Sequence, residues 1–418
     1  MNYKFYFISV CLCILAFANA NGTPFRYVGG DVSLLPDYED ANAKYYDQDG
    51  KAIDDVLSFC HDKGMNCMRV RLFVNPGNYT GPEQDSNAKQ DHDYIIPLCK
   101  QIRDHGFALM LDFHYSDTWA DPAKQWTPKA WEGLSDSELY KKIYDYTKET
   151  LETLRKNGVV PEFIQPGNEI SYGMLWGPAG TSNPIKVYAG SNDNWNRFAK
   201  LLSNAIQACR EECPDAKIII HTERVAQPSY LKQFYEKLKN YNIDYDIIGL
   251  SYYPYFHGSL NVLRTSMIEL ETSFPAKDIM IVETGYPYAW EVPGTNQKVD
   301  YPYTESGQAA FAEDLVDTLL QFKNCTGLFW WWFEYNAKNT DLTGWYNAPL
   351  FDSRTGKVTK AFDEICSFGS GPFEAGIENL TISPTILEDQ WYDIHGWPVL
   401  LPTRPGFYIK NGRIVIVK

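Results

Sequence analysis

Two glutamates, Glu169 and Glu283, stand where short apolar runs give way to loops rich in glycine, proline and aromatic residues. Runs this short and this rich in β-branched residues favour buried strands over helices. Two carboxylates at strand ends can face each other across a cleft, and a pair that flanks one bond is the machinery of glycoside hydrolysis. A single such glutamate often caps a helix or lies on the surface, so the interpretation depends on the pair.

The rest of the chain predicts a frame that would bring this pair together. Strand and helix patterns alternate eight times between residues 26 and 366, which is typical of a (β/α)8 TIM barrel. The predicted strands are Tyr27–Asp31, Cys67–Phe73, Ala108–Tyr115, Phe163–Asn168, Lys217–His221, Ile247–Tyr252, Ile279–Glu283 and Gly327–Phe333. The predicted helices are Ala52–Lys63, Tyr94–His105, Ser135–Lys156, Asn194–Cys213, Ser229–Asn240, Ser259–Phe274, Ser306–Phe322 and Lys357–Ser367. An open doubly wound sheet is the alternative, but no glycine-rich phosphate-binding motif follows any strand.

The loops differ between the two ends of the predicted barrel. Those after the third, fourth, seventh and eighth strands are long and aromatic, whereas loops at the opposite end, such as 63–66, are short and plain. The chain has 12 tryptophans and 29 tyrosines, more than a core alone explains. We interpret part of this excess as platforms on which sugar rings stack.

Charge and the first residues restrict the partners. The formal net charge of -15 disfavours nucleic acid and anionic membranes and favours a neutral ligand. Residues 1–20 predict a secretory signal, with Lys4, an apolar segment Phe5–Phe17 and a small-residue cleavage site Ala18–Ala20. We therefore expect no transmembrane span after signal removal, and export to the periplasm, the cell surface or the medium. A monomer is expected.

Three regions follow from these patterns: the signal at 1–20, a catalytic barrel at 21–368, and a linker with a small β-rich tail at 369–418. The linker opens with Gly369–Pro372, and an Asn411-Gly412 turn predicts a hairpin near the end. Seven cysteines follow the signal, an odd number that leaves at least one thiol free. We expect most of them to be small buried hydrophobic residues.

Several segments resemble glycoside hydrolase family 53, a family of endo-β-1,4-galactanases among barrel glycosidases that carry acid and nucleophile on strands 4 and 7. They are Gly167–Glu169, Val282–Pro287, Leu111–Pro122, Gly249–Gly258 and Gly344–Asp352, and the resemblance covers about residues 25–367. It implies a (β/α)8 barrel and retention of configuration, with Glu169 as acid/base and Glu283 as nucleophile.

The resemblance also implies roles for two residues beside the glutamates. Arg71 matches the strand-2 arginine that would hydrogen-bond the nucleophile, or else it forms a salt bridge in the barrel wall. Trp331 matches the strand-8 tryptophan beneath the sugar, although Trp330–Trp332 leaves the register open. The chain departs from the relatives' Trp-Glu-Pro at this point, because Trp331 is followed by Trp332 and Phe333, with Glu334 one place later.

Further substrate-binding residues are predicted from the matched segments. Asp112 and His114 lie two apart on one strand and share a face, as substrate contacts or as a satisfied internal pair. Asn168 would point away from Glu169 unless the backbone bends, in which case its amide could donate to a sugar hydroxyl. The remaining candidates for the cleft are Trp119, Tyr252, Tyr253 and His257.

No cofactor is required by this chemistry. Some bacterial members of the family bind calcium between loops 7 and 8, where Asp300, Asp341 and Asn347 offer oxygen ligands, although their spacing fixes no coordination shell. The expected function is a retaining endo-β-1,4-galactanase that acts on pectic galactan. The alternatives are a related endo-glycanase acting on xylan or mannan, and a surface glycan-binding protein on an inactive barrel.

Overall fold

The computed structural model describes residues 25–370, apart from 82–83, 293, 296 and 337–347, together with the segments 391–393, 398–399, 406–410 and 413–417. The chain divides into two compact units, Met1–Glu374 and Ala375–Lys418. The predicted signal at 1–20 lies outside the described residues. Gly369 and Ser370, which we expected to open the linker, instead end the last helix of the first unit.

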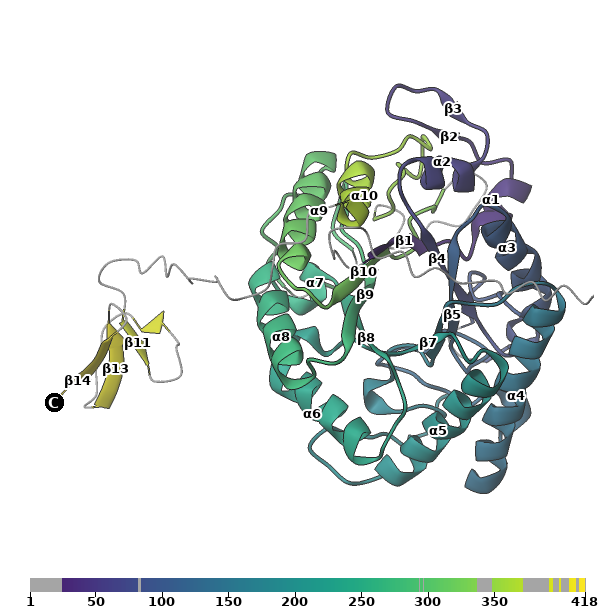
Figure 1. Cartoon of the computed structure of the whole chain (residues 1–418), viewed down its shortest axis with the longest axis horizontal. Helices are drawn as coiled ribbons and strands as arrows, with labels where there is room; N and C mark the ends of the chain where they lie inside the picture. The colour runs from purple at the N-terminus through teal and green to yellow at the C-terminus, as the bar shows by residue number, and fades with distance from the viewer. Residues whose placement is uncertain are drawn as a thin grey trace, which may run out of the picture. The chain divides into compact units, whose positions relative to one another are not determined.

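The first unit is a closed barrel of eight parallel strands in the described part of the chain, in the order β1-β10-β9-β8-β7-β6-β5-β4 (Figure 1). Its strands are β1 (Tyr27–Asp31), β4 (Cys67–Leu72), β5 (Ala108–Phe113), β6 (Phe163–Pro166), β7 (Lys217–Thr222), β8 (Ile247–Tyr252), β9 (Asp278–Thr284) and β10 (Cys325–Trp330). The predicted (β/α)8 architecture is confirmed.

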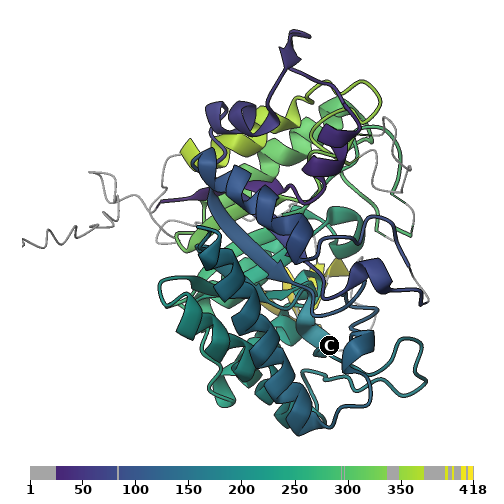
Figure 2. The ribbon, with the colours of Figure 1, turned by 90° about the vertical axis from the view of Figure 1, so that its right-hand side faces the viewer.

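Helices follow the strands and surround the barrel, and Figure 2 shows them lying along its outer wall. The main ones are α2 (Val56–Asp62), α3 (His92–Asp104), α4 (Asp136–Lys156), α5 (Trp195–Glu212), α6 (Pro228–Asn240), α8 (Leu260–Ser273), α9 (Glu305–Leu320) and α10 (Ala361–Ser370). Shorter elements are α1 (Leu35–Asp40), α7 (Pro254–His257), the hairpin β2 (Tyr45–Tyr46) and β3 (Ala52–Ile53), and single 3-10 turns such as η3 (Ile170–Tyr172) and η4 (Arg224–Ala226). None of the helices in the described residues is both long and apolar enough to cross a bilayer.

The first predicted helix begins four residues too early. Ala52 and Ile53 pair with Tyr46 and Tyr45 in the hairpin, and α2 begins only after Asp55. The Asp55 side chain caps the helix by accepting a hydrogen bond from Ser58 N at 2.9 Å.

The barrel interior changes from apolar to polar along its axis. Inward-facing residues form a buried apolar cluster, with Cys67, Met110, Phe163 and Ile219 in the first half of their strands, joined by Ile247, Met280, Val282 and Phe329. Two residues further along β4, β5, β6 and β7, on the same face, the side chains are Arg69, Asp112, Gln165 and His221, all fully buried. The apolar plug supports a polar layer beneath the C-terminal mouth, where catalytic residues of such barrels lie.

The seven described cysteines are all buried, as expected for most of them, and all are unpaired, whereas the odd number alone required only one free thiol. The second unit contains a four-stranded sheet in the order β12-β11-β13-β14. Its strands are β11 (Trp391–Asp393), β12 (Pro398–Val399), β13 (Gly406–Lys410) and β14 (Arg413–Val417), and the last two form an antiparallel hairpin.

Candidate active site

The backbone bends sharply where β6 ends, and this bend places Asn168 and Glu169 at the same cleft. Gly167 has φ +118, and Glu169 adopts the left-handed conformation at φ 47, which non-glycine residues rarely occupy. A Cβ at Gly167 would meet Ile170 Cγ2 at 2.6 Å, so glycine is required. Because the backbone bends here, Asn168 and Glu169 both line the cleft although they are adjacent in sequence.

Glu283 reaches the cleft through an irregularity in β9. Leu250 of β8 pairs with Ile281, but the next residue, Ser251, pairs with Glu283, so Val282 is an extra residue in the ladder. Such bulges turn a side chain away from its regular direction and occur often beside active sites. The bulge brings Glu283 level with Ser251.

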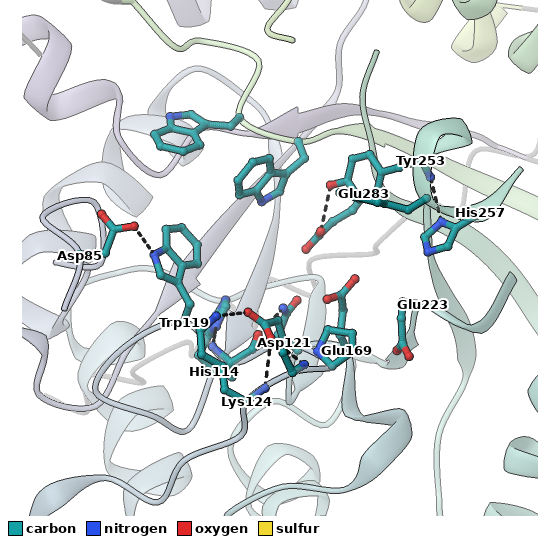
Figure 3. A pocket seen from close by; sticks show the side chains of 17 residues that line it. Asp85, His114, Trp119, Asp121, Lys124, Glu169, Glu223, Tyr253, His257 and Glu283 are labelled. Carbon is teal, nitrogen blue, oxygen red and sulfur yellow. Dashed lines mark hydrogen bonds and ion pairs between the residues drawn. The ribbon is translucent and has the colours of Figure 1, made fainter. Parts of the chain in front are cut away.

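The two glutamates face each other across the cleft (Figure 3). One carboxylate oxygen of each, together with one ring nitrogen of His221, lies within 4.8 Å of the others. Carboxyl groups about 5 to 5.5 Å apart suit direct attack on an anomeric carbon, whereas pairs that activate a water between them stand about 6.5 to 9.5 Å apart. The separation therefore fits a covalent, retaining mechanism.

Glu283 is held by a cation and a phenol. Its Oε1 lies 2.8 Å from Arg69 Nη2, and its Oε2 accepts a hydrogen bond from the Tyr253 hydroxyl at 3.1 Å. Burial raises the pKa of Glu283 to about 7, and the charge of Arg69 opposes that rise. Arg69 also contacts Asp112 Oδ2 at 2.8 Å and Asp31 Oδ2 at 3.3 Å, so one cation balances three carboxylates.

Glu169 lacks such a cation. Burial raises its pKa well above the ordinary value, and the charges of Glu283 and Glu223 raise it further, while the hydrogen bond from Ser251 acts in the opposite direction. Two facing carboxylates with unlike partners take up protons unequally. The proton belongs on Glu169, and the negative charge belongs on Glu283 beside Arg69.

Hydrogen bonds behind Glu169 hold its carboxyl group in place. Asn168 Oδ1 accepts from Arg69 at 2.9 Å and lies 3.0 Å from His221 Nδ1, which is also 3.4 Å from Glu169 N. Burial lowers the pKa of His221 well below its usual value, so the ring is neutral, and its Nε2 lies 2.8 Å from the Ser251 hydroxyl oxygen. The Ser251 hydroxyl donates to Glu169 Oε1 at 2.6 Å.

The cleft has a volume of about 540 Å³ and is open at the mouth of the barrel. Eight of the eleven predicted site residues line it: His114, Trp119, Asn168, Glu169, Tyr253, His257, Glu283 and Trp331. Trp119 and Trp331 pack edge to face with ring centroids 6.1 Å apart, and Trp119 Nε1 donates to Asp85 Oδ2 at 2.8 Å. At the opposite end, His257 Nδ1 accepts from Tyr253 N at 3.0 Å and fixes that loop.

Three predicted residues do not line the cleft. Arg71 does not contact Glu283: it lies 3.5 Å from Asp31 Oδ1 and 4.7 Å from the Trp119 ring, behind the aromatic wall. The arginine that binds Glu283 is Arg69, two residues earlier on the same strand, and Arg71 instead forms the barrel-wall salt bridge that the sequence left as the alternative. Arg69 and Arg71 share a face of β4, and only their depth in the barrel separates them.

Asp112 and Tyr252 are also set back from the cleft. Asp112 is fully buried, and its Oδ2 binds Arg69 and lies 3.1 Å from His114 Nε2, so it is the internal polar partner that the sequence left as an alternative. The Tyr252 hydroxyl donates to Gly258 O at 2.9 Å, and its ring packs against Phe311 of α9 on the outside of β8. Because side chains alternate along the strand, Tyr252 points outward and Tyr253 points into the cleft.

Several site residues were missed from the sequence. Glu223 lines the cleft just after β7, and its position at a strand end could have identified it as it did Glu169. Trp332 lines the cleft beside Trp331 and has left-handed backbone at φ 53, which settles the register of the triple tryptophan. His221 and Ser251 are single polar residues within strands and gave no signal. Asp85, Asp121 and Lys124 come from loops, and Phe256 comes from α7.

Replacement of Arg69 by lysine is expected to move the acidic limb of kcat/KM to higher pH. A lysine cannot contact Glu283, Asp112 and Asp31 together, so the pKa of Glu283 should rise. Glu283 then becomes ionised only at a higher pH. Arg71→Lys is the matched control, because it changes a neighbouring arginine without touching Glu283. Profiles of kcat/KM against pH for the two variants test the assignment, and equal shifts would contradict it.

One group of metal-binding side chains occurs among the described residues, and it is Glu169, His221 and Glu283 themselves. Asp300 is exposed, whereas Asp341 and Asn347 lie in 337–347, outside the described part of the chain. Calcium therefore stays a prediction.

A parallel barrel with two facing carboxylates at its C-terminal mouth defines a glycoside hydrolase of the barrel type. Residues 27–365 match the sequence profile of glycosyl hydrolase family 53, and the chain belongs to this family.

Among its relatives is an arabinogalactan endo-beta-1,4-galactanase of Cellvibrio japonicus, 34% identical over 82% of this chain and 92% of that protein. A probable arabinogalactan endo-beta-1,4-galactanase A of Neosartorya fischeri is 32% identical over 73% of this chain and 83% of its own length. The family 53 catalytic domain of Ignisphaera aggregans superimposes with a TM-score of 0.71 at 29% identity, covering 82% of this chain and 96% of that domain.

Proposed function

We propose that this protein is a retaining endo-β-1,4-galactanase. The observation that carries the proposal is the distance between the carboxylates, within 4.8 Å at their nearest oxygens, in a cleft with aromatic walls. A separation of that size leaves no room for a water between nucleophile and anomeric carbon. The substrate is inferred from the relatives, which are named as galactanases.

The reaction proceeds in two displacements. Glu283 attacks the anomeric carbon while Glu169 gives its proton to the glycosidic oxygen, so that the C–O bond breaks and the leaving sugar departs with a hydroxyl group. Glu169, now ionised, then takes a proton from water, whose oxygen attacks the same carbon and releases Glu283. The two inversions together retain the configuration, and both carboxyls return to their starting states.

Polar residues beside the glutamates support these steps. Arg69 and Tyr253 keep Glu283 charged and oriented until it attacks. When Glu169 loses its proton, the Ser251 hydroxyl, which donates to Glu169 Oε1 at 2.6 Å, stabilises the new charge.

The pH dependence of kcat/KM is expected to be bell-shaped with an acidic limb near pH 7, because burial raises the pKa of Glu283 to about 7. Below that pH the nucleophile is protonated and inactive. The alkaline limb reports loss of the proton of Glu169, whose pKa is raised well above its ordinary value by burial and by the charges of Glu283 and Glu223. Initial rates on galactan across the pH range test this, and full activity well below the pKa of Glu283 would contradict it.

Digestion of galactan, xylan and mannan, with sizing of the products, tests the substrate. A mixture of short oligosaccharides from galactan alone is expected. Release from xylan or mannan instead would favour the related endo-glycanases. No release from any of the three, with retained binding to galactan, would favour a glycan-binding protein on an inactive barrel.

The proposal also includes where the protein acts and with what. Export to the periplasm, cell surface or medium follows from the signal predicted at 1–20, outside the described residues, and a monomer stays a prediction. The polysaccharide partner follows from membership of a glycoside hydrolase family. Calcium would act as a structural ion if bound, because the two glutamates do the chemistry without a metal.

A further inference from the structure

A second cavity, of about 270 Å³, lies beside the cleft on the side of β6 and β7. We call it the tyrosine pocket, and its walls are Ser171, Tyr172, Tyr188, Ala189, Arg224, Gln227, Tyr230 and Phe234. These residues come from η3 and the loop after it, from η4, and from the start of α6. They therefore belong to the C-terminal mouth of the barrel, as the two glutamates do.

Two of its tyrosines are far more exposed than large rings usually are. The exposed fractions are 52% for Tyr188 and 53% for Tyr230, the two highest among the exposed large hydrophobic residues in the described chain. Their rings flank the same cavity, whose base is the buried Phe234. Exposed aromatic rings around a cavity are typical of ligand-binding surfaces, and tyrosine offers both an apolar face and a polar edge.

The cation in the tyrosine pocket is already engaged. The Arg224 guanidinium stacks on the Tyr172 ring at 4.1 Å, donates to Ser171 Oγ and to Gln227 Oε1, and lies 3.2 Å from Glu223 Oε1. An anionic ligand would have to compete with those contacts. The pocket is thus suited to a neutral ligand that presents both apolar faces and hydroxyl groups, as a sugar ring does.

Glu223 connects the tyrosine pocket with the cleft. It lines the cleft, and its Oε1 accepts a hydrogen bond at 2.7 Å from Ser171 Oγ of the pocket wall. Its other oxygen, Oε2, is buried and has no hydrogen-bond partner among the described residues. A buried carboxylate oxygen without a partner is costly. A sugar hydroxyl that passes from the cleft to the pocket would supply the missing donor.

The position of the pocket fixes which end of a polysaccharide would reach it. Trp119 and Asp85 lie at one end of the cleft and Glu223 at the other, with Glu169 and Glu283 between them (Figure 3). Glu169 gives its proton to the departing sugar and lies on the Glu223 side of the cleft, so sugars beyond Glu169 belong to the leaving group. The tyrosine pocket lies further along that direction, past Glu223.

We propose that the tyrosine pocket is a distal subsite for the leaving-group end of the galactan chain, entered past Glu223, with Tyr188 and Tyr230 stacking on a sugar ring. This inference rests on the proposed function, because it takes the same chain as its ligand. It gives the enzyme a preference for long substrates, since short ones end before the pocket.

The test is the double variant Tyr188→Ala/Tyr230→Ala. The ratio of kcat/KM on polymeric galactan to kcat/KM on a nitrophenyl β-1,4-galactobioside, whose leaving group is a single ring, is expected to fall roughly tenfold to a hundredfold. The ring-retaining variant Tyr188→Trp/Tyr230→Phe should keep most of the ratio. Tyr144→Ala, on the outer helix α4, removes a tyrosine elsewhere and should leave the ratio unchanged.

Binding gives a second measurement that does not need turnover. In the Glu283→Gln background, the affinity for a galacto-oligosaccharide long enough to pass Glu223 should fall when both tyrosines become alanine, with little change for a galactobiose. Equal effects on long and short ligands, or no effect, would overturn the subsite while leaving the galactanase proposal intact. A wild-type protein that releases nothing from galactan would overturn both.

Discussion

Replacement of Glu283 by glutamine is expected to lower kcat on galactan by roughly 10⁴- to 10⁶-fold, the range seen when a nucleophile is removed from a preorganised site. An amide has nearly the shape of the carboxylate but cannot form the glycosyl ester. Arg69 keeps Asp112 and Asp31 as partners, at 2.8 and 3.3 Å, so its charge is not left unbalanced. The cleft should therefore stay intact while turnover is lost.

Two measurements separate this outcome from simple unfolding. Calorimetric titration with a galacto-oligosaccharide should show binding close to that of the wild type, because Trp119, Trp331 and Asn168 are unchanged in the cleft. Glu271→Gln is the matched control: Glu271 is a buried glutamate on α8, outside the cleft, and its replacement is expected to remove the same group without loss of activity. Hydrolysis retained in Glu283→Gln would exclude Glu283 as the nucleophile.

The sequence predicted the frame well because hydrophobic runs and their ends carry most of the information in a parallel barrel. β1 and β8 have the predicted bounds, and the other barrel strands begin or end within a few residues of them. Strand ends in such a barrel share one rim, so locating the ends of β6 and β9 was enough to bring Glu169 and Glu283 together.

Depth within the barrel could not be predicted in the same way. Arg69 and Arg71 have the same residue type, the same strand and the same face, and only closure of the barrel decides which one reaches β9. The bulge at Val282 was equally hidden, because nothing in an apolar run marks the residue that leaves the ladder. His221 and Ser251 gained their roles from partners on other strands, which a single sequence does not reveal.

Replacement of Glu169 by alanine is expected to slow the hydrolysis of galactan far more than the formation of the glycosyl enzyme from a substrate with an activated leaving group. Galactan needs its departing oxygen protonated, so kcat should fall roughly 10²- to 10⁴-fold, the usual contribution of a general acid. A dinitrophenyl galactobioside has a leaving group that departs as a stable anion, so formation of the glycosyl enzyme should be much less affected. The same variant should lose the alkaline limb of the pH profile, since that limb reports the proton of Glu169.

Rescue by azide distinguishes an acid/base from a residue that only shapes the cleft. Azide is already an anion and needs no base, so it should attack the glycosyl enzyme in Glu169→Ala, speed turnover of the activated substrate and yield a glycosyl azide of retained β configuration. Glu223→Gln is the matched control in the same cleft. It removes a charge that raises the pKa of Glu169, so the alkaline limb should move to lower pH without disappearing, and azide should have no effect. If azide failed to rescue Glu169→Ala, or rescued Glu223→Gln, the acid/base role would pass to Glu223, which faces the same cleft with one oxygen unpartnered among the described residues.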